Sequence, residues 1–110
     1  MATLTKQDIV RAGLAASYAA CAGGGDKFTN TGVEVIHIKN ASVGSIDVTI
    51  DTPATVDGLA VAQRTVAVGA GAEKFIGPFP PSTYNDTGGF VNLSYSGVTT
   101  LTIAVLDPTE

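Results

Sequence analysis

The chain lacks the residues from which catalytic and metal sites are usually built. Its 110 residues include no tryptophan, one cysteine (Cys21) and one histidine (His37). A single cysteine excludes an internal disulfide, so packing or association must hold the fold together. A Ser–His–acid triad would depend on His37 alone, and a zinc site would need Asp or Glu to complete it. We therefore expect a non-enzymatic protein with no catalytic residue, no metal and no cofactor, in which His37 is a hydrogen-bonded structural residue.

Positive charge is also scarce. The net charge is −4, and the six Lys and Arg residues are scattered singly along the chain. A surface that binds nucleic acid or an anionic membrane needs clustered cations. There is also no apolar run of the roughly 18 residues that span a bilayer. The sequence predicts neither nucleic-acid nor membrane partners.

What the chain has in abundance is β-branched side chains. Val, Ile and Thr total 33 residues, against six Leu. Branched side chains favour strands, and the 13 Gly and five Pro supply frequent chain reversals. A chain of this length forms one core and therefore one domain. The composition predicts an all-β fold.

Alternating apolar and polar residues mark about seven strands. In residues 33–40, Ile36 and Ile38 share one face while His37 shares the other; residues 45–51 and 100–105 alternate as cleanly. The remaining strands are expected near residues 26–30, 66–68, 75–76 and 91–95. The links at residues 41–44 and 69–72 have the length of hairpin turns. With no helix-length connections, we expect a single-domain antiparallel β-sandwich or small barrel at residues 26–110.

Residues 1–25 form a distinct N-terminal arm. The segment is rich in alanine and ends in three glycines, Gly23 to Gly25. Val10, Leu14, Tyr18 and Cys21 recur at helical spacing, but Gly13 weakens a helix by about 1 kcal/mol relative to Ala. The alternative is an extended arm that lies on a neighbouring subunit. The sequence leaves both open.

The proline segment, residues 73–86, concentrates rings and prolines. Phe75, Phe79 and Tyr84 are three of the seven aromatic residues, and three of the five prolines lie among them. Because proline has no backbone N–H and a fixed φ, we expect stiff extended chain at an edge or surface. The three rings either plug one end of the core or anchor a partner, and both can hold if one ring turns inward and another outward.

Three stretches together resemble the small head decoration (capsid cement) proteins of tailed bacteriophages. They are DIVRAGLAASYAA, TVDGLAVAQRTVAV, and EKFIGPFPPSTYND followed by LTIAVLDP, spanning roughly residues 8–106. The resemblance implies a β-sandwich or small barrel that binds the major capsid protein on the outer surface of the phage head. It also implies a non-enzymatic structural role in the virion, often as a homotrimer.

Two regions are the candidate partner interface. They are the arm around Arg11 and the proline segment, and their candidate residues are Ile9, Arg11, Leu14, Tyr18, Phe75, Phe79, Pro80, Pro81 and Tyr84. The alternatives are a tail, collar or head-fibre component and a small carbohydrate- or ligand-binding β-module. A hydrolase would depend on His37.

Overall fold

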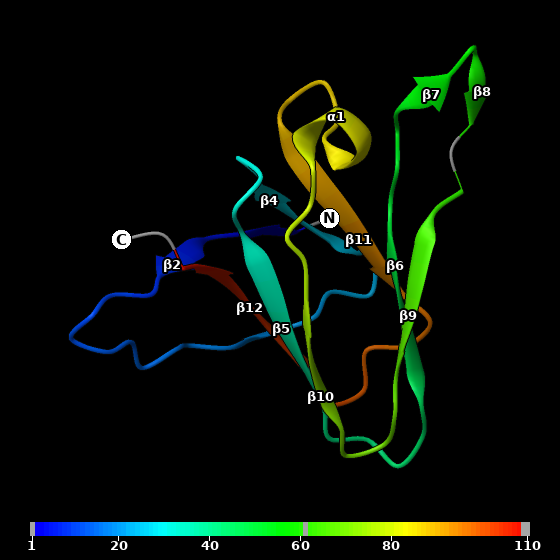
Figure 1. The fold of residues 1–110 in the computed structure, drawn as a ribbon. Coiled ribbons are helices and arrows are strands. Elements are labelled where there is room, and N and C mark those ends of the chain that lie inside the picture. Colours follow the sequence, from blue (N-terminus) through cyan, green and yellow to red (C-terminus); the bar gives the residue numbers. More distant parts are fainter. Residues whose placement is uncertain (1, 61, 109–110) are drawn as a thin grey trace.

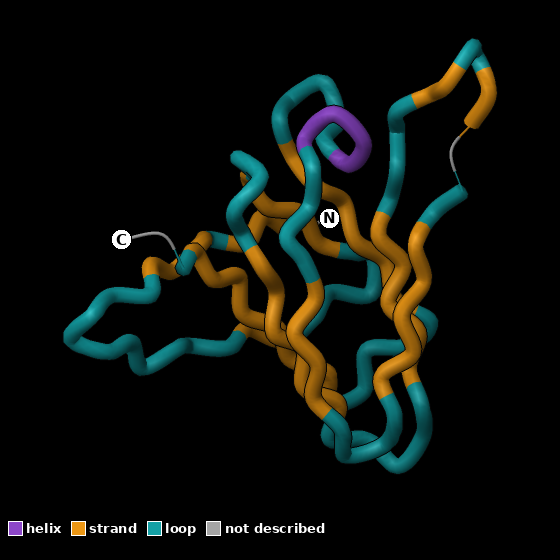
Figure 2. The backbone as a smooth tube through the Cα atoms, in the orientation of Figure 1, coloured by secondary structure: helices purple, strands orange, loops and turns teal. Residues whose placement is uncertain are grey.

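The computed structural model describes residues 2–60 and 62–108, which form two β-sheets packed against each other (Figures 1 and 2). The first sheet has the order β1 (Ala2–Leu4), β4 (Asp26–Thr29), β11 (Phe90–Tyr95), β6 (Ile46–Ile50) and β9 (Arg64–Val68). The second has the order β10 (Glu73–Ile76), β5 (Val35–Asn40), β12 (Leu101–Asp107) and β2 (Lys6–Asp8), with β3 (Ala19–Ala20) also on β12. The short strands β7 (Thr55–Val56) and β8 (Leu59–Ala60) form a separate hairpin. The prediction of an all-β sandwich is confirmed.

The core is built from the alternations seen in the sequence. Ile36 and Ile38 of β5 are fully buried, as are Val48 and Ile50 of β6. Apolar side chains from both sheets meet between the layers, and the largest fully buried ones are Phe28, Phe79, Ile36, Ile38, Ile50, Leu93, Leu101 and Ile103. Burial of a branched or aromatic side chain contributes about 1.5–3 kcal/mol, so this layer supplies most of the stability.

The two links expected to be hairpin turns are not hairpins. Residues 41–44 connect β5 to β6, and residues 69–72 connect β9 to β10, yet each link joins strands of different sheets. The side chain of Asn40 stabilises this arrangement, because its Nδ2 donates to the carbonyls of Gly44 and Val68 at 2.9 Å each. One buried amide therefore bonds to the backbone at both of these crossings between the sheets.

The sheets are mixed rather than purely antiparallel. β1 pairs parallel to β4, and β2 pairs parallel to β12. Both of these strands belong to the N-terminal arm, for which no pairing was predicted, whereas the described strands of residues 26–107 pair with one another in antiparallel fashion, as predicted. About twenty residues separate β1 from β4, which is long enough for a parallel crossover.

The N-terminal arm is extended in its described part, residues 2–25, where short strands and loops take the place of the helical alternative. β2 and β3 both border β12, β2 beside Val105 to Asp107 and β3 beside Thr102 and Ile103. Between them the chain leaves the sheet as a loop, which is visible in blue in Figure 1. The arm strands pair within their own chain: β2 and β3 extend the second sheet, and β1 extends the first.

The proline segment is extended only in its first part. Edge strand β10 is followed by extended chain, but α1 (Pro81–Tyr84) is one turn of helix, so the expectation of extended chain throughout was wrong there. Pro81 starts this turn, where its missing N–H is not needed. Gly77 is required for the approach to β5: its φ is +127°, and a Cβ there would lie 3.2 Å from the Glu34 carbonyl oxygen.

Phe79→Ala is predicted to destabilise the fold far more than Phe75→Ala. The Phe79 side chain is 2% exposed and its ring centroid lies 5.9 Å from that of Phe28, whereas Phe75 is 70% exposed. Removing a buried phenylalanine ring costs about 3–5 kcal/mol, while the exposed ring of Phe75 loses mainly a stacking contact of roughly 0.5–1.5 kcal/mol. Urea unfolding of both variants measures the difference. Equal losses would contradict the assignment of Phe79 to the core.

Candidate functional site

The predicted arm residues lie on a loop that leaves the sandwich. The arm loop (residues 9–18) runs out from β2 and returns at β3 (Figure 1). Its base is closed by Gln7, whose side chain donates to the Ser17 carbonyl at 2.7 Å and accepts from the Ser17 N–H at 2.8 Å. The Gln7 side chain thus makes the same two hydrogen bonds to the Ser17 backbone that a neighbouring strand would make. The loop is held at both ends by the body of the protein.

Apolar side chains are exposed on this loop. Ile9, Val10 and Leu14 are each 36–37% exposed. Ile9, Val10 and Arg11 line a shallow hollow of about 370 Å³ together with Pro108, which follows β12. Four of the predicted interface residues lie on this projecting loop: Ile9, Arg11, Leu14 and Tyr18.

The arm and the proline segment meet at His37. The Tyr18 hydroxyl lies 2.6 Å from Nδ1 of His37, and Glu73 accepts from Nε2 at 3.0 Å. The Phe75 ring stacks on the imidazole at a centroid distance of 4.1 Å, and the Lys39 ammonium lies 3.9 Å from the centre of the Tyr18 ring. Both ring nitrogens of His37 therefore have partners, which confirms the hydrogen bonding that the sequence analysis expected of this residue.

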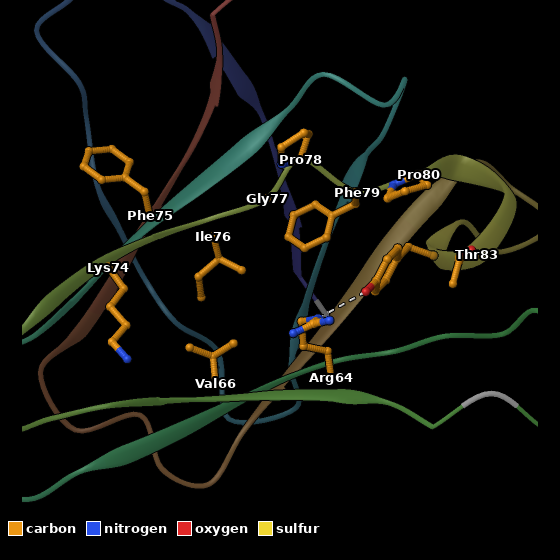
Figure 3. Close-up of a pocket in the computed structure, with 11 residues that line it drawn as sticks. Arg64, Val66, Lys74, Phe75, Ile76, Gly77, Pro78, Phe79, Pro80 and Thr83 are labelled. Carbon is orange, nitrogen blue, oxygen red and sulfur yellow. Dashed lines mark hydrogen bonds between the residues drawn. The ribbon is translucent and has the colours of Figure 1, made fainter.

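The rest of the proline segment lines a groove between β9 and β10. Figure 3 shows Arg64 and Val66 pointing from β9 and Lys74 and Ile76 pointing from β10 into the same space, while Phe75 points the other way. The groove has a volume of about 630 Å³, and its other lining residues are Phe75, Gly77, Pro78, Phe79, Pro80, Thr83 and Tyr84.

Three predicted aromatic residues therefore have three environments. Phe79 is inside the core, Tyr84 is half-buried with its ring edge-on to Phe79, and Phe75 is on the surface. The Tyr84 hydroxyl accepts from Nε of Arg64 at 3.4 Å. Pro80 and Pro81 are exposed at the end of the groove. One ring inward and another outward is what the sequence analysis allowed.

Sequence reasoning missed the buried polar residues that position these features. Asn30 fastens the proline segment to the body: its Nδ2 donates to the Phe79 carbonyl at 2.9 Å and to Oδ1 of Asn85 at 2.7 Å. Lys6 of β2 donates to Asp107 of β12 at 2.9 Å. No local pattern marks these residues, because each partner comes from a distant part of the chain.

Glu34 is the most deeply buried acid near this ion pair. Its carboxylate lies 3.8 Å from the Lys6 ammonium and accepts from the backbone N–H of Thr31 at 2.7 Å, with the Thr31 hydroxyl at 2.9 Å. Burial raises the pKa of Glu34, but hydrogen bonds from Thr31 and from the backbone of Glu34 and Val33 together outweigh burial, so its pKa lies below the ordinary value of 4.5. The carboxylate is therefore the favoured form in the folded protein.

Cys21 lies in a second buried polar cluster. It is 6% exposed, and Tyr95 beside it donates to Oδ2 of the fully buried Asp26 at 2.7 Å. Burial raises the pKa of the Cys21 thiol to about 11, which the hydrogen bond with Tyr95 offsets in part. A thiol is reactive only as the thiolate, so the raised pKa keeps Cys21 in its unreactive, protonated form at neutral pH.

Comparison with known proteins identifies no relative: no family model, curated protein or solved structure matches the chain. Among residues 2–60 and 62–108, no helix is long and apolar enough to cross a membrane. Within the same ranges, no three His, Cys, Asp or Glu side chains are grouped so that they could hold a metal ion.

Glu34 is predicted to make stability depend on acid pH. Because its folded-state pKa is lowered, its contribution is fully present above the unfolded pKa of about 4.5 and is lost as the pH falls through the folded value. Urea unfolding from pH 7 to pH 3 should show this loss. Glu34→Gln should be less stable at pH 7 by about 1–3 kcal/mol and should flatten the acid limb; an unchanged limb would contradict the assignment.

Cys21 is predicted to be inert until the protein unfolds. With a pKa of about 11 and 6% exposure, its thiol should react with a disulfide reagent at pH 8 only as fast as the chain opens. Labelling should become at least tenfold faster in denaturing urea. Fast labelling of the folded chain would show that the cysteine is accessible.

Proposed function

We propose that this chain is a non-enzymatic structural protein that binds the outer surface of a bacteriophage head and reinforces the shell. Its partner is the major capsid protein, and it binds as a homotrimer. The observation that carries the proposal is the arm loop, where exposed apolar side chains project from a rigid body. The sequence resemblance to head decoration proteins supports it independently.

The arm loop suits a contact with another protein. Ile9, Val10 and Leu14 lie close together in sequence on a loop whose base is closed by Gln7 and Ser17. Neighbouring exposed apolar side chains are typical of interaction surfaces. A loop fixed at both ends loses less conformational entropy on binding than a free tail.

The polar chemistry of the body supports a structural role. His37 is held between Tyr18 and Glu73, and its ring is stacked on Phe75, so the imidazole is engaged as part of the framework. Glu34 and Asp26 are likewise hydrogen-bonded within the body.

Trimer formation would strengthen a weak individual contact. Each copy presents one arm loop, and three loops held on one particle bind at high effective concentration after the first has docked. Overall affinity can then exceed that of one loop by about 10²–10⁴. Small domains without disulfides also gain stability when a partner covers their apolar surface.

Substitution of the arm loop tests the proposal. Ile9→Ser combined with Leu14→Ser should reduce co-sedimentation with empty shells of the virion's major capsid protein at least tenfold, because the apolar contact is lost. Light scattering of the wild-type protein without shells should give a mass three times that of one chain, which is 11.1 kDa.

Val43→Ser is the matched control, since Val43 is fully exposed on the link between β5 and β6. Circular dichroism should show that all variants remain folded. Wild-type protein that fails to sediment with shells, or a double variant that binds as well as Val43→Ser, would refute the role of the arm loop.

A further inference from the structure

The groove between β9 and β10 lies between two sheet edges. β9 ends the first sheet and pairs only with β6, and β10 ends the second and pairs only with β5, among residues 2–60 and 62–108. The two strands are consecutive in the chain, yet the link at residues 69–72 sends them into different sheets. Their backbone edges therefore flank the groove without bonding to each other (Figures 1 and 3).

The register shows which backbone groups of β10 are free to bind. The Asn40 N–H donates to the carbonyl of Ala72, so Ala72 faces β5. Because antiparallel strands alternate, Lys74 and Ile76 also face β5 with their backbone groups, while those of Glu73 and Phe75 point outward. An incoming strand would find N–H and C=O groups at these two residues.

Side chains on either side of the edge suit an extended ligand. Ile76 and Val66 form an apolar floor between the strands, with Lys74 and Arg64 beside them (Figure 3). On the opposite face of β10, Phe75 is 70% exposed, which is unusual for so large a ring in a chain with seven aromatics. A strand placed beside β10 would cover Phe75 as well as the groove floor.

The charge of the groove selects the kind of ligand. Its 11 lining residues include Arg64 and Lys74 and no acid, in a chain whose net charge is −4. The other four cations lie elsewhere: Lys6 binds Asp107, Lys27 lies over Phe90, Lys39 lies over Tyr18, and Arg11 is on the arm loop. Lys74 and Arg64 are thus the two cations placed to meet a carboxylate in this groove.

We propose that the groove binds an extended acidic segment of another protein, which adds to β10 as an antiparallel or parallel strand. Main-chain hydrogen bonds to Glu73 and Phe75 hold the segment. Its inward side chains alternate between apolar ones against Ile76 and Val66 and carboxylates that pair with Lys74 and Arg64. This binding stands apart from the proposed shell contact of the arm loop, and either can exist without the other.

A displayed library of random eight-residue segments tests the proposal. Wild-type protein should enrich segments in which an apolar and an acidic residue lie two positions apart, because residues two apart share the face toward the groove. The variant Lys74→Glu with Arg64→Glu should lose at least tenfold affinity for the enriched segments and should itself select basic ones. Lys27→Glu with Lys39→Glu is the matched control and should change affinity less than twofold, since both cations lie outside the groove.

Proline substitution identifies the edge that is used. Glu73→Pro removes an outward N–H from β10 and should abolish binding, whereas Thr65→Pro on β9 should leave it within twofold. Near-ultraviolet circular dichroism checks that each variant is folded.

Three results would overturn the proposal. One is a wild-type protein that enriches no segments, or segments without acids. Another is an equal loss of affinity in the groove variant and in the control. The last is a wild-type dimer that Lys74→Glu dissociates, because the edge would then be occupied by a second copy of the chain.

Discussion

The architecture depends on where the chain crosses between its sheets. Four of the links that connect β5, β6, β9, β10, β11 and β12 carry the chain from one sheet to the other. One face of each sheet, lined with branched side chains, therefore packs against the other sheet. The buried Asn40 amide holds two of these crossings together, with bonds to Gly44 and Val68. A buried amide without partners would cost about 1–3 kcal/mol. The Asn40 amide therefore needs these carbonyls as partners, and the two crossings in turn are held in place by the amide.

The sequence analysis recovered strands and faces but not their pairing. Ile36 and Ile38 could be placed on one face of their strand because alternation is local, and both are fully buried. A four-residue link is equally compatible with a hairpin and with a crossing between sheets, so residues 41–44 and 69–72 were misassigned. The N-terminal strands were missed because Lys6, Gln7 and Asp8 carry no apolar alternation; they are strands because β12 provides an edge for them.

The candidate sites also contain some residues that the sequence could predict and others that it could not. The candidate residues of the arm and the three rings of the proline segment could be named from the sequence, but the ring that points outward, Phe75, could not be singled out. Arg64 and Lys74 could not, since ten residues separate them and only the crossing at residues 69–72 turns both toward one groove. His37 is where the two predicted regions meet: Tyr18 comes from the arm and Phe75 from the edge strand. Because Tyr18 and Phe75 contact the same imidazole, a displacement of either ring would shift the other through His37.

The parallel pairing of β2 with β12 has a mechanical consequence. These strands lie near opposite ends of the chain, and they run side by side in the same direction. Tension that pulls the two ends of the chain apart would slide one strand along the other. The backbone hydrogen bonds of this pair and the Lys6–Asp107 contact would then be loaded together in shear, and they would not break one after another.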